Sequence, residues 1–146
     1  MIRLTSCMVY QREIQLHTTG HREMHDLTGD VTRVVHASGI RAGTVNVFNV
    51  GSTGAIGTIE FESGLQKDLP AMLDKLFPPS REYGHEQAWH DGNGHSHLQA
   101  TTLGPSITVP ITDGKLALGT WQQIFHLECD IKPRRRTIVI TVMGDV

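Results

Sequence analysis

Short apolar patterns of two different periods divide the chain into strands and helices. Alternating apolar positions predict strands over residues 8–18, 44–50, 56–62, 122–129 and 137–143. Residues 106–112 are apolar and β-branched, and Asp113-Gly114 after them is typical of a hairpin turn with a return arm at 116–118. Residues 51–54 interrupt the pattern between 44–50 and 56–62, so those two strands are also expected to form a hairpin.

Helical spacing occurs twice. The first apolar stripe predicts a helix that Thr28 caps and Gly39 ends; its members are Val31, Val34, Val35 and Ser38. The second stripe predicts a helix over 68–77, capped by Asp68 and with Pro70 in its first turn; its members are Leu69, Met72, Leu73 and Leu76. Antiparallel strands with two inserted helices predict an α+β fold, as a single domain over residues 1–146.

The composition narrows the classes of function. A chain of 146 residues with 38% apolar content can bury about two-thirds of its unfolded surface. A net charge of −2 argues against a general binder of nucleic acid or anionic membranes. No apolar run is long enough to span a bilayer, and no signal-peptide pattern opens the chain. Cys7 and Cys129 lack CxxC spacing, so both are expected to be reduced thiols in a cytoplasmic protein.

Candidate chemistry concentrates in residues 83–97, which read YGHEQAWHDGNGHSH. Four of the nine histidines lie here, together with Asn93, and Gly92 and Gly94 allow tight turns between them. His95 and His97 are two residues apart, so on a strand or an extended loop both would project to one side as ligands of one metal ion. His85 or His90 could add a third ligand. An acid/base or phosphate-binding role without metal, or structural loop histidines, are the alternatives.

Three further features could contribute to a site. Strand alternation places Arg134 and Arg136 on one side, where a guanidinium pair could clamp a phosphate; a solvated basic turn is the alternative. Trp121 is either a stacking wall for a flat ring or an anchor in the core or an interface. Glu60 lies on the polar face of the 56–62 strand, which is either solvent-exposed or one wall of a site.

A specific set of motifs runs through nearly the whole chain. In the C-terminal half they are His97-Leu98-Gln99-Ala100, Leu103-Gly104-Pro105-Ser106, Pro110-Ile111, Asp113-Gly114, Gly119-Thr120-Trp121-Gln122, Glu128, Arg134-Arg135-Arg136 and Gly144. Upstream they are Asp26-Leu27-Thr28, Ser38-Gly39-Ile40, Gly43 and Ser52-Thr53 to Glu60. In combination these motifs resemble the YjbQ-type family, described as secondary thiamine-phosphate synthase enzymes.

The resemblance implies a compact α+β fold of antiparallel sheets and a homotrimer with sites near subunit boundaries. It also implies a transferase that joins a pyrimidine diphosphate to a thiazole phosphate and releases pyrophosphate. A metal-dependent phosphohydrolase or transferase acting on another small phosphorylated molecule, and a non-catalytic trimer that binds a ligand or metal, are the alternatives. A divalent metal is expected as cofactor, either zinc or, with a diphosphate substrate, magnesium.

This chain departs from the family pattern at one histidine. Family members usually carry His-Thr-Thr or His-Thr-Ser where this chain has Gly51-Ser52-Thr53. The family pattern has equivalents of His85 and His97, and His95 is an addition. We therefore predict that His95 replaces the lost ligand, which gives a metal set of His85, His95 and His97.

The candidate residues can be given roles in the synthase reaction. Arg134 and Arg136 would take the developing negative charge of the leaving pyrophosphate. Trp121 would lie against a ring, and Glu128 or Glu60 would hydrogen-bond an aminopyrimidine. Ser52, Thr53 and Asn93 are the predicted substrate-binding residues.

Overall fold

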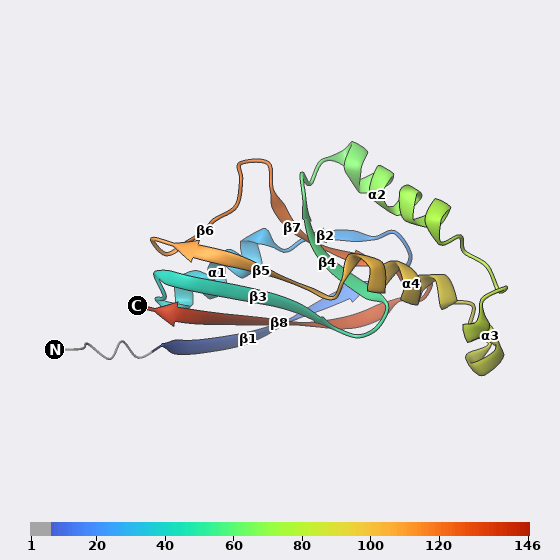
Figure 1. Ribbon diagram of the computed structural model, residues 1–146, viewed down its shortest axis with the longest axis horizontal. Coiled ribbons are helices and arrows are strands. Elements are labelled where there is room, and N and C mark those ends of the chain that lie inside the picture. The colour runs from blue at the N-terminus through green and yellow to red at the C-terminus, as the bar shows by residue number, and fades with distance from the viewer. Residues whose placement is uncertain (1–6) are drawn as a thin grey trace.

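The computed structural model describes residues 7–146, and its strands and helices alternate irregularly along the chain (Figure 1). The α+β prediction is confirmed, although the described residues form four helices where two were predicted. The prediction of one domain over 1–146 includes residues 1–6, which lie outside the described residues. The elements in order are β1 Met8–Thr18, β2 Met24–Asp26, α1 Thr28–Ser38, β3 Ala42–Val50, β4 Gly54–Ile59, α2 Ser63–Leu76, α3 Gly84–Trp89, α4 Gly94–Leu103, β5 Ser106–Thr112, β6 Lys115–Leu116, β7 Gln123–Glu128 and β8 Arg134–Asp145.

The larger sheet has five antiparallel strands in the order β1-β8-β3-β5-β6. The long strand β8 lies between β1 and β3, where Ile138 is opposite Ile14 and Ile140 is opposite Val47. Ile138, Ile140 and Val47 are fully buried, so the inner face of this sheet forms the main core. Asp113 and Gly114 have φ values of 52° and 75°, and they make the predicted turn between β5 and β6.

The smaller sheet has three strands in the order β2-β7-β4, and it is buried on both faces. Ile56 and Ile124 belong to the main core, whereas their neighbours Ala55 and Phe125 belong to a second core beneath α2 and α4. The predicted hairpin of 44–50 with 56–62 is therefore wrong. Residues 44–50 belong to the larger sheet, and β4 pairs with β7 instead.

Helix α1 confirms the first helical prediction. Val31, Val34 and Val35 are buried in the main core, and Gly39 ends the helix in a left-handed conformation with φ of 70°. The predicted cap is wrong, because Leu27 is the N-cap residue and the Thr28 hydroxyl accepts a hydrogen bond from the Ile124 amide instead.

Helix α2 begins at Ser63, five residues before the predicted start at Asp68. The carboxylate of Glu62 accepts hydrogen bonds from the amides of Gly64 and Leu65, so Glu62 caps the helix. Pro70 consequently lies inside the helix, not in its first turn.

The segment predicted as a histidine loop followed by strand contains the two additional helices, α3 and α4. His90 ends α3 with φ of 57°, and α4 begins two residues after Gly92. Gly94 packs directly on Tyr83, since a Cβ atom at position 94 would lie 2.7 Å from that of Tyr83. His95 and His97 are therefore helical neighbours, and their side chains diverge by about 200° around the helix axis.

Among residues 7–146, no helix covers the outer face of the larger sheet (Figure 1). Val9, Phe48, Val50 and Met143 are exposed there at 40–63%. None of the described helices has the length and apolarity required to cross a membrane.

Candidate functional site

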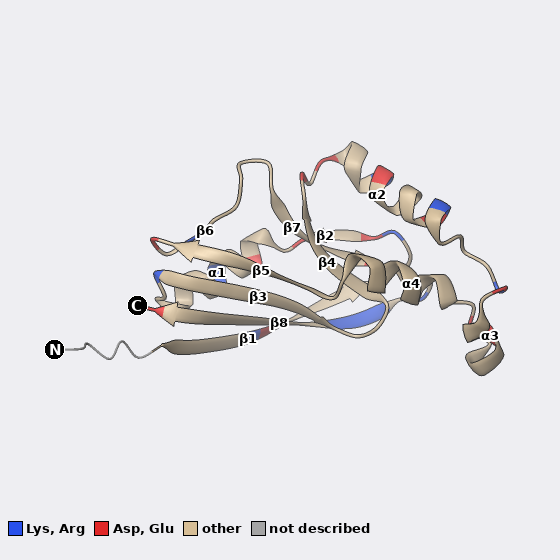
Figure 2. Ribbon diagram, in the orientation of Figure 1, with Lys and Arg blue, Asp and Glu red and all other residues tan. Residues whose placement is uncertain are grey.

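A cavity of about 510 Å³ lies where three parts of the fold meet: the turn between β3 and β4, the start of β8, and the α3–α4 segment. The basic residues at the start of β8 lie near α4, as the blue part of β8 shows (Figure 2). The cavity is lined by Gly51, Ser52, Thr53, His85, Trp89, Asp91, Asn93, His97, Asp130, Arg134, Arg135 and Arg136.

Arg136 is held in place by a buried ion pair. Its Nε donates to Oε2 of Glu128 at 2.8 Å, and its Nη2 donates to Oε1 of Glu128 and, at 2.8 Å, to the hydroxyl of Thr53. Glu128 is fully buried and also accepts hydrogen bonds from the Thr18 hydroxyl and the Asp130 amide. A desolvated pair of this kind persists only when its polar atoms are hydrogen-bonded, as they are here. Glu128 thus orients Arg136 and does not line the cavity.

Arg134 is oriented in the same way by Asp130. The guanidinium Nε and Nη2 donate to Oδ2 of Asp130 at 3.0 and 2.8 Å, and the Thr53 hydroxyl donates to the same oxygen at 3.0 Å. Burial alone would raise the pKa of Asp130, but the hydrogen bonds from Thr53 and Arg134 outweigh it and lower that pKa below its ordinary value. Asp130 is therefore a fixed carboxylate at neutral pH.

Each guanidinium keeps one nitrogen for a ligand. Among the described residues, no hydrogen bond is made by Nη1 of Arg134 or Nη1 of Arg136. Gly51 leaves space beside Arg136, because a Cβ atom at this position would lie 2.9 Å from Nη1. Since Glu128 and Asp130 balance the two cations, this wall offers directed N–H groups more than net positive charge.

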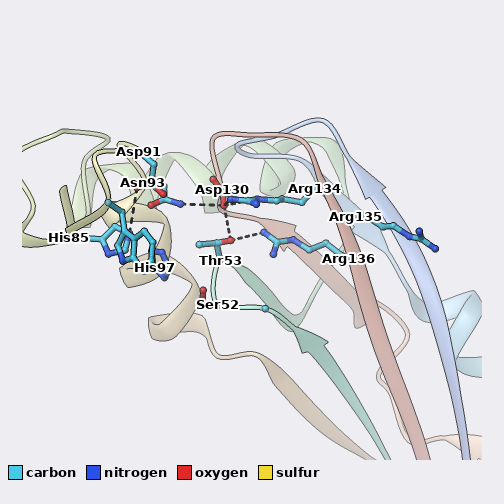
Figure 3. A pocket seen from close by; sticks show the side chains of 12 residues that line it. Ser52, Thr53, His85, Asp91, Asn93, His97, Asp130, Arg134, Arg135 and Arg136 are labelled. Atoms are coloured by element: carbon cyan, nitrogen blue, oxygen red, sulfur yellow. Dashed lines mark hydrogen bonds and ion pairs between the residues drawn. The ribbon is translucent and has the colours of Figure 1, made fainter. Parts of the chain in front are cut away.

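Arg135 differs from its two neighbours, as strand alternation predicts. Its Nε donates to Oε1 of Gln15 at 3.2 Å, and its side chain points away from Arg134 and Arg136 (Figure 3). Only two of the three consecutive arginines can therefore serve one ligand.

The opposite wall carries a pair of imidazoles. The rings of His85, from α3, and His97, from α4, have centroids 4.5 Å apart and an interplanar angle of 54°. Burial, and next the neighbouring His85, lower the pKa of His97, which is therefore neutral near pH 7. Figure 3 shows this pair across the cavity from the arginines, with Asn93 and Asp130 between them.

Seven of the predicted site residues line this cavity, and four do not. Ser52, Thr53, Asn93, His85, His97, Arg134 and Arg136 are brought together. Glu60 is exposed beyond the end of β4, and Trp121 is 71% exposed on the loop before β7. Glu128 lies behind Arg136, and His95 lies on the far side of α4.

His95 is placed in a separate buried cluster. Its ring lies 5.5 Å from that of His21 and 6.3 Å from that of Tyr83, and the side chain is 1% exposed. Burial, and next the nearby His21, lower the pKa of His95. The helical geometry that carries His97 to the cavity therefore directs His95 away from it.

The donors present do not fit the predicted three-histidine metal centre. His85 and His97 are adjacent, but His95 is directed elsewhere, and within residues 7–146 no group of three or more His, Cys, Asp or Glu side chains is arranged to hold a metal ion. Asp91 is the nearest carboxylate, with Oδ1 at 3.6 Å from Nε2 of His85. We therefore assign no reaction step to a metal, and the metal stays a prediction.

Two important residues of the cavity were not given a role from the sequence. Asp130 accepts hydrogen bonds from Arg134, Thr53 and Asn93. In the sequence, the feature that could have identified it is a carboxylate just before four cationic residues. Trp89 is 71% exposed and contributes the aromatic surface that had been assigned to Trp121. Nothing in the local sequence indicates that Trp89 lines the cavity and Trp121 does not, because the packing of α3 places Trp89 there.

Comparison with known proteins gives one consistent family. Residues 12–145 match the family model described as UPF0047 protein YjbQ-like. A UPF0047 protein of Methanothermobacter thermautotrophicus is 45% identical over 136 residues, which cover 93% of this chain and 93% of the relative. The UPF0047 protein YugU of Bacillus subtilis is 33% identical over 91% of this chain and 98% of its own length. Among solved structures, a YbjQ-like protein of unknown function from Sulfolobus solfataricus has a TM-score of 0.89 at 36% identity, and covers 96% of this chain and 100% of that one.

Proposed function

The chain belongs to the YjbQ-like UPF0047 family, and we propose that its cavity is the active site of a transferase acting on small phosphorylated molecules. The reaction is of the secondary thiamine-phosphate synthase type: a pyrimidine diphosphate is joined to a thiazole phosphate, and pyrophosphate is released. The observation that carries the proposal is the pair of arginines, Arg134 and Arg136, each fixed by a buried carboxylate with Nη1 left for a ligand.

The diphosphate end of the substrate lies against the strand wall. The free Nη1 groups supply N–H donors, and the space beside Gly51 admits a phosphate oxygen next to Arg136. The hydroxyl of Ser52 lies on the same wall. Donors held in place before the substrate arrives stabilise the charge that develops on the leaving group, without reorganisation during the reaction.

The bond changes balance without an external oxidant or base. The thiazole nitrogen forms a bond to the pyrimidine methylene carbon, the carbon–oxygen bond to the diphosphate breaks, and pyrophosphate leaves with that electron pair. Such a reaction depends on positioning and on neutralisation of the leaving group. His97, neutral because of its lowered pKa, donates an N–H hydrogen bond to the diphosphate or to the thiazole phosphate.

The size and aromatic surface of the cavity support a ring-containing substrate. A volume of about 510 Å³ is within the range of small-molecule sites. Trp89, at the rim, provides a face on which a flat heterocycle stacks. In this assignment Trp89 takes the role that the sequence had given to Trp121.

Three expectations from the sequence are proposed with this function: the oligomeric state, the compartment and the metal. The protein assembles as a homotrimer, for which the exposed apolar side chains on the outer face of the larger sheet offer support. It acts in the cytoplasm. Magnesium enters as the counter-ion of the diphosphate substrate. Whether the protein itself holds a zinc ion is tested by metal analysis of wild-type and His97→Ala protein purified without an affinity tag.

Turnover with purified substrates tests the proposal. The protein is incubated with the aminopyrimidine diphosphate, magnesium and the thiazole phosphate, and thiamine phosphate and pyrophosphate are measured. The proposal predicts equal amounts of both products, and at least about 10²-fold slower turnover for His97→Asn, with little change for His36→Asn on α1. Release of pyrophosphate without thiazole phosphate would identify a hydrolase, and tight binding without turnover would identify a binding protein; either outcome overturns the transferase.

A further inference from the structure

Unpartnered polar atoms gather in one short segment at the start of α4. Among residues 7–146, six buried side-chain nitrogen or oxygen atoms have no hydrogen-bond partner. Five of the six belong to residues 91–96, and the sixth is Nδ1 of His126. The five are Oδ1 of Asp91, Oδ1 of Asn93, Nδ1 and Nε2 of His95, and Oγ of Ser96.

Only two of these side chains line the cavity. Asp91 and Asn93 contribute to its wall, whereas His95 and Ser96 do not. The unpartnered atom of each is an oxygen that accepts hydrogen bonds, and Oδ1 of Asp91 is 3.6 Å from Nε2 of His85, which is too long for a hydrogen bond. The helix side of the cavity therefore includes two side chains with an acceptor oxygen that receives no hydrogen bond from the described residues.

The orientation of Asn93 is set by its neighbour. Its Nδ2 lies 3.5 Å from Oδ2 of Asp130, a carboxylate that can only accept, so the amide nitrogen faces Asp130 and Oδ1 faces the other way. Figure 3 shows Asn93 between Asp130 and the two histidines. Asn93 is 3% exposed, so a change of side-chain direction is restricted by packing.

Buried acceptors without partners are unfavourable, and a ligand that supplies donors removes that penalty. Leaving such a group unsatisfied costs the free energy of removing it from water. Two such acceptors two residues apart in the sequence, one of them on an acidic residue, favour a ligand group with two N–H bonds over a hydroxyl or an apolar group.

We infer that Asp91 and Asn93 form a subsite for an amino group of the phosphorylated ligand. The inference rests on the proposed function, which places the phosphate of the ligand at Arg134 and Arg136. It adds a site that recognises the other end of the ligand. It also replaces Glu60 and Glu128 as partners of an aminopyrimidine, because Glu60 is outside the cavity and Glu128 is fully engaged by Arg136. The ligand spans the cavity, with its anionic end at β8 and its amino group at the start of α4.

The test compares three probes by isothermal titration calorimetry. They are pyrophosphate, an aminopyrimidine-methyl phosphate, and its analogue in which a methyl group replaces the amino group. Wild-type protein is expected to bind the amino probe at least about tenfold more tightly than the methyl probe. Asn93→Ala and Asp91→Ala are each expected to remove most of this preference. Because Asn93 is hydrogen-bonded to Asp130, which orients Arg134, only Asp91→Ala is expected to leave the affinity for pyrophosphate unchanged.

Ser96→Ala is the matched control, because it removes an unpartnered buried hydroxyl from the same helix but outside the cavity. It is expected to keep the full preference for the amino probe. Equal binding of the two pyrimidine probes, together with pyrophosphate binding, would overturn the subsite and leave the phosphate site standing. Failure of wild-type protein to bind pyrophosphate or either phosphorylated probe would overturn the proposed function itself, and the subsite with it.

Discussion

The two walls of the cavity differ in whether their polar side chains find hydrogen-bond partners within the protein. On the strand wall, Arg134, Arg136, Glu128 and Asp130 satisfy one another through short hydrogen bonds, and Thr53 links the two ion pairs. On the helix wall, Asp91 and Asn93 keep acceptor atoms without partners. The strand wall is held together by its own ion pairs and leaves only Nη1 of each arginine for a ligand, whereas we infer that the acceptors of Asp91 and Asn93 gain partners when a ligand binds.

This difference separates residues that stabilise the fold from residues that discriminate between ligands. A satisfied buried ion pair is strongly destabilised when one member is removed, because the other charge is left desolvated. An unpartnered buried acceptor is unfavourable in the free protein and gains a favourable contact only on binding. Substitutions of the strand-wall arginines should therefore change both unfolding and phosphate binding, whereas substitutions of Asp91 or Asn93 should mainly change binding.

The largest expected effect is on the strand wall. Arg136→Met leaves the buried carboxylate of Glu128 without its cation and should lower the free energy of unfolding by about 3–5 kcal/mol, measured by urea denaturation. Arg135→Met, at the next position of β8, removes an exposed side chain and should change it by less than about 0.5 kcal/mol. Similar values for the two variants would contradict the distinction between the walls.

His126 should make stability depend on pH. Nε2 of this fully buried residue lies 3.0 Å from Oδ1 of Asn49; burial, and next the charge of Arg136, lower its pKa from 6.5 to about 3. Because the unfolded chain binds the proton more readily, this residue's contribution is intact above about pH 6.5 and is lost as the pH falls toward about 3. The loss is at most about 1.4 kcal/mol per pH unit.

Urea denaturation at about pH 7.5 and about pH 5 measures this dependence. His97 and His95, whose pKa values are also lowered, add to the dependence in wild-type protein. The informative quantity is thus the difference from His126→Gln, which should lose less stability between the two pH values. An identical loss in both proteins would exclude a neutral, buried His126 as its source.

The smallest effect is expected at Ser96. Ser96→Ala removes a buried hydroxyl that has no partner, so it should leave the free energy of unfolding unchanged or raise it by up to about 1 kcal/mol. Thr53→Ala, which removes a hydroxyl bonded to both Asp130 and Arg136, should lower it by about 1–3 kcal/mol. Thermal unfolding of the two variants measures the difference. A lower unfolding temperature for Ser96→Ala than for Thr53→Ala would contradict the claim that the bonded hydroxyl stabilises the fold and the unpartnered one does not.

Apolar periodicity predicted the elements that bury an apolar face. Val31, Val34 and Val35 identified α1, and strand alternation placed Arg134 and Arg136 together and Arg135 apart. It could not reveal α4, whose buried face carries His95, Ser96 and Gln99 in place of an apolar stripe. A polar buried face follows from tertiary contacts and leaves no periodic signal.

The composition of the site was partly accessible from the sequence and its geometry was not. Residues 85–97 and 134–136 were identified because donors of one kind are concentrated there. The separation of His95 from His97 depends on helical geometry at residues expected to be extended. The turn at 51–53 was expected to close a hairpin, and it instead joins strands of different sheets, which brings Thr53 between the two ion pairs.

Pyrophosphate binding tests the central claim, which is that the fixed arginines form a phosphate site. Isothermal titration calorimetry would compare wild-type protein with Arg134→Met, which removes a 42% exposed cation and leaves Asp130 hydrogen-bonded to Thr53; circular dichroism at the titration temperature verifies that the variant is folded. We predict one pyrophosphate bound per chain, and at least about tenfold weaker binding to the variant. No binding to wild-type protein, or equal affinity in the two proteins, would contradict the account.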